Sequence, residues 1–331
     1  MKEILKKLLT PYGATGREET VAQVIIDMVK PYCDEIRTDA MGNVICIQHG
    51  EGERVMLAAH MDHIGFIVAD IDEDGFLRVH NVGGINTAVS LNRHVVFENG
   101  VHGLVCKEAE PAPSAHPAIN KMYIDIGASS REEAEKMVQI GDVAVYVPDF
   151  IELAGTRAAA PAMDDRAGCA ILVKLLMECR GCGKEVCAVF TTQEEVGLRG
   201  ARAAAFDLDP QVGIALDVTL TGDSPALKNF AMKLGEGAAV KVMDSSVICH
   251  PGVVRKLEEA GARCGHKYQR EVLSGGGTDT AAIQSTRCGV PAGAISIPCR
   301  YVHSAVEMVD IADLESAAAL LNEYLRGDVL F

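Results

Sequence analysis

Five separate parts of the chain carry histidine or carboxylate side chains of the kind that bind divalent metal ions. Imidazole and carboxylate groups are common ligands of zinc, cobalt and manganese in proteins. A carboxylate can lie between two ions, and a second carboxylate nearby can take a proton from water. Such a set predicts a hydrolytic centre with two metal ions. The side chains are His60, Asp62, Asp164, Glu194, Glu195, Asp217 and His303.

The segments beside these residues indicate where each would lie. Continuous apolar runs are typical of strands buried in a parallel sheet. In an open α/β sheet, ligands bind beyond the carboxyl ends of the strands, so we expect these side chains to converge at one edge. Four strands are predicted, and each leads to one of the side chains: 55–59 to His60, 186–192 to Glu194, 212–216 to Asp217 and 292–297 to His303. A helix is predicted from 167 to 179, just after Asp164.

Each piece also has an ordinary structural explanation. A His-x-Asp triplet arises often by chance, and paired acids usually lie on a solvated surface or cap a helix, a role that Asp164 would also fit. A single histidine such as His303 is commonly a surface residue. The coincidence of five such groups at the ends of elements favours metal binding, because buried carboxylates without cations would be costly.

Composition excludes several classes of protein. The chain has 331 residues, 48% of them hydrophobic, which is enough for a sizeable core. Its net charge of −15 argues against nucleic-acid binding, which needs a basic surface. No apolar run approaches the roughly 20 residues that span a bilayer, and the amino terminus does not resemble a signal peptide. The 11 scattered cysteines indicate free thiols in a reducing cytoplasm.

The chain reads as one α/β domain interrupted by a β-rich insert. Residues 1–65 and 158–331 show buried strands alternating with amphipathic helices. Residues 66–157 instead show short strands between Gly, Asn and Asp turns, which predicts a small β domain.

Several segments together resemble the glutamyl aminopeptidase/cellulase-M family of dinuclear metallo-aminopeptidases, which includes the tetrahedral TET peptidases. The likeness covers nearly the whole chain, and the combination of motifs is highly specific. The segments that carry it are Ala58–Phe66, Ile124–Ser130, Met163–Gly168, Thr192–Gly197, Gly275–Asp279 and Arg300–Ser304.

This resemblance implies a fold, a site and an assembly. The fold would be an α/β/α catalytic domain with a mixed sheet and a barrel-like or PDZ-like insert. His60 and Asp217 would bind one metal, Glu195 and His303 another, and Asp164 both. Asp62 would orient His60, and Glu194 would be the general base. The family also implies an insert used for dimerisation and dimers assembled into a hollow dodecamer.

The chemistry that follows is aminopeptidase action through a water that bridges two divalent ions, zinc or cobalt first, with manganese also open. Such ions lower the pKa of the water toward ~7 in favourable zinc sites. Glu194 would take its proton and pass it to the leaving amine. The substrates would be short peptides, and the loop Gly275–Thr278 is a hypothesis for part of the side-chain pocket.

Three other functions use some of the same residues, but each conflicts with a feature of the chain. Related carboxypeptidases and deacylases usually carry their extra domain after the catalytic glutamate pair, whereas here the long insertion lies between Asp62 and Asp164. An endoglucanase would need two carboxylates across a sugar cleft and often aromatic platforms, but the chain has no Trp. A shell-forming scaffold without activity would have a broken ligand set.

One residue departs from the family pattern. His63 stands where family members usually have Glu. Two hypotheses follow: the second imidazole adjusts the charge, metal choice or pH dependence of the site, or it is only a local change in packing.

Overall fold

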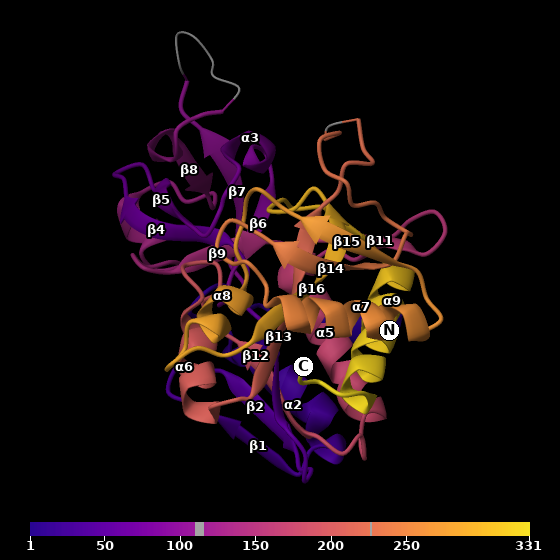
Figure 1. Cartoon of the computed structure of the whole chain (residues 1–331). Helices are drawn as coiled ribbons and strands as arrows, with labels where there is room; N and C mark the ends of the chain where they lie inside the picture. The colour runs from indigo at the N-terminus through magenta and orange to yellow at the C-terminus, as the bar shows by residue number, and fades with distance from the viewer. Residues whose placement is uncertain (110–115, 226) are drawn as a thin grey trace.

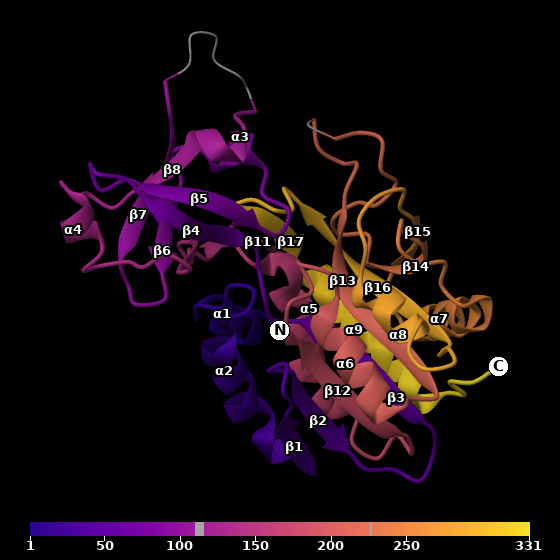
Figure 2. The ribbon, with the colours of Figure 1, turned by 90° about the vertical axis from the view of Figure 1, so that its left-hand side faces the viewer.

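The structure is a computed structural model that describes residues 1–109, 116–225 and 227–331. Within these residues, an eleven-stranded mixed sheet lies between helices, and a closed barrel of six strands stands beyond the end of the central strand β3 (Arg54–His60), as Figures 1 and 2 show. The prediction of an α/β domain interrupted by a β-rich insert is confirmed. In the described part of the chain, no helix combines the length and apolarity that a membrane span needs.

The large sheet is built from strands on both sides of the insert. Its central strands are parallel and almost entirely buried, which explains their continuous apolar sequences. The remaining strands of this sheet are β1 (Glu35–Thr38), β2 (Val44–Gln48), β10 (Ile151–Glu152), β11 (Arg157–Ala160), β12 (Glu185–Thr191), β13 (Val212–Leu220), β14 (Ala238–Met243), β15 (Tyr268–Val272), β16 (Ala292–Arg300) and β17 (Glu307–Asp310).

The order of the strands brings the predicted ligands together. The main path runs β1-β2-β12-β3-β13-β16-β17-β11-β10, with β14 paired to β16 and to β15. Strands β12, β3, β13 and β16 are parallel neighbours, so their carboxyl ends meet at one edge. Thr191 pairs with His60 across β12 and β3, while Asp217 pairs with Ser296 across β13 and β16.

Side chains alternate between the two faces of the sheet, and each face has its own core. In β3, Val55, Leu57 and Ala59 face the larger core, whereas Met56 and Ala58 face the smaller one. The larger core is closed by α1 (Lys2–Leu9), α2 (Glu19–Val29), α5 (Met163–Glu178), α7 (Pro251–Arg263) and α9 (Ile311–Arg326), and the smaller one by α6 (Arg199–Leu208) and α8 (Asp279–Gln284).

The barrel closes in the order β4-β5-β8-β7-β6-β9 around a separate apolar core that includes Phe66, Val95, Phe97 and Ile124. Two short helices, α3 (Thr87–Ser90) and α4 (Arg131–Ala134), belong to the same segment. The barrel strands are β4 (Gly65–Ile71), β5 (Leu77–Val82), β6 (His94–Phe97), β7 (His102–Lys107), β8 (Met122–Asp125) and β9 (Val143–Tyr146).

Two strands are longer than the apolar runs predict. The apolar run predicts that β13 ends at Leu216 and delivers Asp217 beyond its end, but the strand continues to Leu220. Strand β16 continues beside it, with Leu220 paired to Cys299, and so supplies the hydrogen bonds of the extension. Asp217 therefore projects from inside a strand, where the ladder fixes its backbone on the side of β16.

Candidate metal centre

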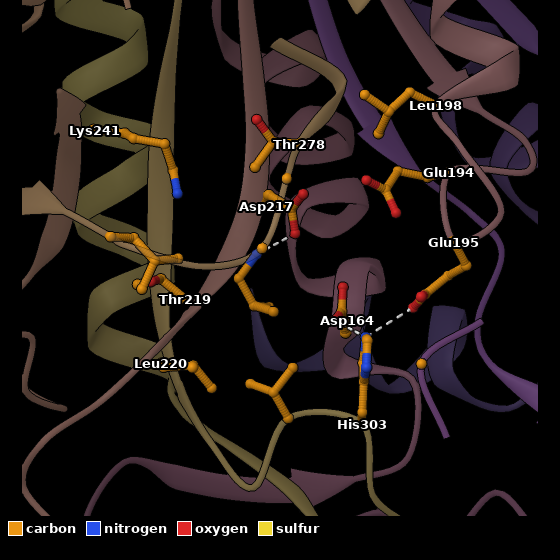
Figure 3. A pocket seen from close by; sticks show the side chains of 16 residues that line it. Asp164, Glu194, Glu195, Leu198, Asp217, Thr219, Leu220, Lys241, Thr278 and His303 are labelled. Carbon is orange, nitrogen blue, oxygen red and sulfur yellow. Dashed lines mark hydrogen bonds and ion pairs between the residues drawn. The ribbon is translucent and has the colours of Figure 1, made fainter. Parts of the chain in front are cut away.

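The predicted ligands form two overlapping groups at the carboxyl edge of the sheet. One consists of His60, Asp164 and Asp217, and the other of Asp164, Glu195 and His303. Within each group, the ligand atoms all lie within 4.8 Å of one another. Asp164 belongs to both, which is the arrangement that a bridging carboxylate requires. Figure 3 shows Asp164 beside His303 and Glu195, with Asp217 and Glu194 on the opposite side of the space.

The distances within the groups are short. His60 Nε2 lies 3.0 Å from Asp164 Oδ1 and 3.9 Å from Asp217 Oδ1. His303 Nε2 lies 3.3 Å from Asp164 Oδ2 and 3.3 Å from Glu195 Oε1. The two oxygens of Asp164 thus face different imidazoles, one from each group.

The start of α5 is distorted in a way that aims Asp164 into the site. Ala162 has a left-handed backbone with φ of 63°, and Asp164 and Asp165 depart from helical φ and ψ. Asp165 does not reach either group. Its Oδ1 accepts the N–H of Gly168 at 2.9 Å, while Oδ2 has no partner within the described residues. Asp164 is therefore not a helix cap but a side chain displaced toward the metal groups.

A left-handed residue also turns the glutamate pair. Gln193 has φ of 53° two residues after the end of β12, so Glu194 and Glu195 do not alternate as they would on a strand. Glu195 joins the second ligand group, and Glu194 Oε2 lies 3.9 Å from His60 Nε2. The adjacent residues Glu194 and Glu195 therefore both face the centre but occupy different positions in it.

Asp62 contacts the glutamate pair more closely than the sequence suggests. Its carboxylate accepts the N–H groups of Glu194 at 3.0 Å and Glu195 at 3.3 Å, and the hydroxyl of Thr15 at 2.8 Å. The acceptor closest to His60 Nδ1 is the main-chain oxygen of Asp62 at 3.0 Å, with the carboxylate at 3.6 Å. One residue thus holds both the first ligand and the turn that carries Glu194 and Glu195.

The charge balance of the site fits divalent cations. Four of its carboxylates, those of Asp164, Glu194, Glu195 and Asp217, each have an oxygen within 4 Å of the Nε2 of His60 or His303 and are largely screened from water. None of the four forms an ion pair with a lysine or arginine among the described residues. Buried carboxylates without such partners need another source of positive charge, and oxygen and imidazole donors are those that divalent ions accept.

The titration of these groups points the same way. Burial would lower the pKa of His303, but hydrogen bonds to Asp164 and Glu195 outweigh it and raise the pKa to about 12. Burial, and next the charge of Asp164, raise the pKa of Asp217 well above its usual range. Burial likewise raises the pKa of Glu194. The site therefore favours a charged imidazole and protonated carboxyl groups. A bound cation would stabilise the same carboxyl groups in their ionised form.

A pocket of about 500 Å³ opens beside the ligands. Asp164, Glu194, Glu195, Asp217 and His303 line one part of it, as Figure 3 shows. The other part is bordered by apolar side chains and by the loop predicted to contribute to it, through Gly276, Gly277 and Thr278. The apolar members are Leu198, Val218, Leu220, Leu273 and Val302.

Two residues at this site, Glu307 and Gly84, are not predicted from the sequence. Glu307 is 2% exposed and accepts the N–H groups of Asp164 and His303. Burial, and next the charge of Asp164, raise the pKa of Glu307 to about 8, so cations bound nearby would favour its ionised form. Gly84 of the barrel segment also lines the pocket. The available signals were a single acid within the otherwise apolar run 306–309 and the Gly-Gly pair at 83–84.

His63, the residue that departs from the family pattern, is buried in the protein. Its side chain is 4% exposed and lies outside both ligand groups. Burial, and next the positive charge of Arg166, lower the pKa of His63 to about 3. The imidazole is therefore neutral at physiological pH.

Comparison with known proteins agrees with the architecture and with a peptidase. The model of the M42 glutamyl aminopeptidase family matches residues 42–320. A putative aminopeptidase of Acetivibrio thermocellus is 47% identical, with 98% of each chain covered. Among solved structures, an aminopeptidase of the archaeon Desulfurococcus kamchatkensis superposes with a TM-score of 0.94 at 36% identity, over 98% of this chain and 94% of its own.

A third relative is known as an assembly. The TET1 peptidase of Pyrococcus horikoshii, whose structure is described as able to form a tetrahedron or a large octahedral shell, superposes with a TM-score of 0.87 at 34% identity over 99% of each chain. The family match covers most of the chain and includes all the predicted ligands. The chain belongs to the M42 glutamyl aminopeptidase family of peptidases.

Proposed function

We propose that this metal-dependent aminopeptidase removes N-terminal residues from short peptides with Glu194 as its general base and with two divalent ions in each subunit. His60 and Asp217 would hold one ion, Glu195 and His303 the other, and Asp164 both. The observation that carries the proposal is that two ligand groups share Asp164 beside a pocket that Glu194 also lines.

The protein groups have separable roles in this reaction. When bound, the ions lower the pKa of the attacking water and polarise the scissile carbonyl. Glu194 takes a proton from that water and delivers it to the leaving amine. The support for this role is that Glu194 lines the pocket, with its Oε2 3.9 Å from His60 Nε2. Asp62 positions Glu194 through its backbone N–H.

The pocket beside the ligands would receive the N-terminal side chain of the peptide. Its wall is mostly aliphatic, from Leu198, Leu220 and Leu273, while Lys241 lies at its border with Nζ 3.1 Å from Glu271 Oε2. An exopeptidase needs such a limited space, because only one residue precedes the scissile bond.

A substrate panel tests the activity against its alternatives. The purified protein, loaded in turn with Zn²⁺, Co²⁺ or Mn²⁺, is assayed on aminoacyl-nitroanilides that cover all N-terminal residues. We expect hydrolysis of free aminoacyl substrates, and no release from the same substrates after N-acetylation. Turnover of the acetylated compounds would favour a deacylase, release of C-terminal residues a carboxypeptidase, and cleavage of carboxymethyl cellulose an endoglucanase.

We also propose that the protein assembles through its barrel into dimers and then into a dodecamer. The support is the similarity to a peptidase described as forming a tetrahedron or an octahedral shell. In this proposal, residues 1–65 and 158–331 form the catalytic domain and residues 66–157 form the dimerisation domain. Strand β10 lies in the second range but pairs within the large sheet. Native mass spectrometry would give twelve subunits; a stable monomer would contradict the assembly.

The cytoplasm is the proposed location. All 11 cysteines are free thiols in the structure, and 5 of them are partly or fully accessible to solvent. Accessible free thiols are kept reduced in that compartment. Fractionation of cells that express the protein at native level tests this placement.

A further inference from the structure

A buried carboxylate joins the two chain segments that carry Asp164 and His303. Glu307 is the first residue of β17, where it pairs with Ala160 of β11. Its Oε2 accepts the N–H of Asp164 at 3.0 Å, and its Oε1 accepts the N–H of His303 at 2.7 Å. The side chain is 2% exposed, so water does not compete for these hydrogen bonds.

Neither of these N–H groups has a partner in regular secondary structure. Asp164 lies in the first turn of α5, where N–H groups have no acceptor within the helix. His303 has φ of 60° in the connection between β16 and β17, outside either ladder. A buried N–H without an acceptor would destabilise the folded chain. Glu307 is the acceptor that lets both segments keep their irregular shape.

The side chains of the same two residues face each other across the second ligand group. His303 Nε2 lies 3.3 Å from Asp164 Oδ2, and both belong to the group that includes Glu195. Because one rigid carboxylate binds both backbones, it fixes the separation of two ligands that are far apart in the sequence. Both Glu307 oxygens are used in this way, and neither belongs to a ligand group.

We propose that Glu307 is a positioning residue that sets the spacing of Asp164 and His303 and thereby shapes the second ion site. The inference rests on the proposed two-ion function. Groups that orient metal ligands from behind typically change metal affinity by 10- to 100-fold when they are replaced. The effect of losing Glu307 should therefore fall on the site of His303 more than on that of His60 and Asp217.

The test uses Glu307→Gln and a matched control. The amide has nearly the shape of the carboxylate but only one acceptor oxygen, so one of the two N–H groups loses its partner. Asp313→Asn is the control, because Asp313 is 1% exposed and also accepts two backbone N–H groups, those of Gly235 and Gly237, both at 2.8 Å. That carboxylate does not line the pocket.

Metal-free proteins are titrated with Co²⁺, whose visible absorption reports the geometry of its ligands, and unfolded in urea without metal. We expect Glu307→Gln to weaken one of two binding steps by about 10- to 100-fold and to alter its spectrum. Asp313→Asn should lose stability similarly, with both steps unchanged. Wild-type affinity and spectrum in Glu307→Gln would overturn the proposal, since its role would then be structural only.

Two further results are informative. If Glu307→Gln does not fold, Glu307→Asp replaces it. We expect this variant, whose carboxylate is one methylene shorter, to bind Co²⁺ more weakly than the wild type. Unchanged binding would overturn the inference. If the wild-type protein itself binds fewer than two Co²⁺ ions per subunit, the proposed function fails together with the inference. Two ions in the wild type with equal binding in the variants would refute the inference alone.

Discussion

Asp62 shows how one side chain can serve two parts of a site. The sequence predicts that its carboxylate orients His60, because an acid two residues from a histidine ligand can accept its second N–H. In the structure, the carboxylate lies closest to Thr15 and the amides of Glu194 and Glu195, and the main-chain oxygen of Asp62 faces His60. Substitutions at Asp62 would thus disturb the proposed general base as well as the first proposed ligand.

The roles of Glu194 and Asp164 can be separated by amide substitutions. Glu194→Gln removes the proton acceptor but none of the proposed ligands, so metal content should stay near that of the wild type while kcat falls by about 10²- to 10⁴-fold. Asp164→Asn removes a ligand common to both groups and should lower metal content as well. Metal analysis and steady-state kinetics on the same preparations check both; full activity of Glu194→Gln would refute its assignment.

His63 allows a prediction about pH. Because its pKa is about 3, this imidazole carries no charge between pH 6 and 9 and contributes no ionisation there. His63→Gln should therefore leave the pH dependence of kcat/KM unchanged over that range, although the absolute rate can differ. The measurement is a pair of profiles under one metal. If the rise or fall of kcat/KM with pH disappeared in the variant, His63 would have to titrate in the active enzyme.

Residue types predict the ligands better than they predict the supporting groups. His60, Asp164, Glu195, Asp217 and His303 stand next to apolar runs and draw notice, and the structure brings all of them together. Glu307 is a single acid at the start of a short strand, and nothing local shows that it receives hydrogen bonds from residues 4 and 143 positions away. Such contacts depend on the tertiary structure.

At the scale of elements, the connection between β5 and α3 comes very close to the ligands. A Cβ atom added at Gly84 would lie 2.5 Å from His303 Nδ1 and 2.7 Å from its Cε1, so the imidazole would have to move. The barrel segment therefore forms part of the wall of the site, and only glycine fits at this contact.

Gly84→Ala should weaken metal binding by about tenfold or more, as changes behind a ligand typically do. The control is Gly275→Ala, because a Cβ there meets no atom within 4 Å and its φ is not positive. Titration with Co²⁺ compares the two variants. Equal affinity in both would show that His303 accommodates the methyl group without leaving its position.

An ion pair holds the end of β16 from which the His303 segment departs. Arg300 donates to Asp223 at 2.9 and 2.7 Å, and both side chains are mostly buried. Burial would raise the pKa of Asp223, but hydrogen bonds from Arg300 and Leu234 outweigh it and lower the pKa to about 2. The unfolded value is 3.8, so this stabilisation is present above that pH and is lost as the pH falls through 2.

Asp223→Asn should consequently cost about 2 kcal/mol at pH 7 and about half of that at pH 3. Urea unfolding at both pH values measures the difference from the wild type. Asp209→Asn is the control, because its partner Arg287 is an exposed residue and such pairs contribute about 0.2–1 kcal/mol. A cost for Asp223→Asn that does not change with pH would exclude the ionised pair as its cause.

Elements differ in how well the sequence foretells them. The central strands are buried on both sides and read as continuous apolar runs, so their positions are predicted closely. Strand β15 has the sequence Tyr-Gln-Arg-Glu-Val and lies at an edge, where mixed exposure hides the pattern. The left-handed turn at Gln193 leaves no local signal either, because glycine or asparagine would be usual there.

For the whole molecule, the metal should contribute to stability. The residues of both ligand groups come from several strands and from α5, so bound ions would connect distant parts of the folded chain. The unfolded chain has no such binding site, so the ions would stabilise the folded state. Removing metal with a chelator should lower the free energy of unfolding, by about 2.7 kcal/mol for one site that had been loaded at 100 times its Kd. Thermal unfolding before and after readdition of Zn²⁺ or Co²⁺ measures this change.

The same experiment on Asp164→Asn provides the comparison. Since this variant lacks the side chain common to both groups, added metal should restore little or none of the stability. An equal gain in the variant and the wild type would mean that the ions stabilise the protein from another place.

The two chain crossings between sheet and barrel have a mechanical consequence. The chain leaves the sheet at His60, shortly before β4, and re-enters it through β10 and β11, which precede Asp164. A force that separates the barrel from the sheet would therefore pull on His60 at one crossing and, through β10 and β11, on the segment that carries Asp164 at the other. In a single-molecule stretching experiment, the loaded enzyme should behave as one unit that yields at high force, whereas the chelated enzyme should let its barrel detach first.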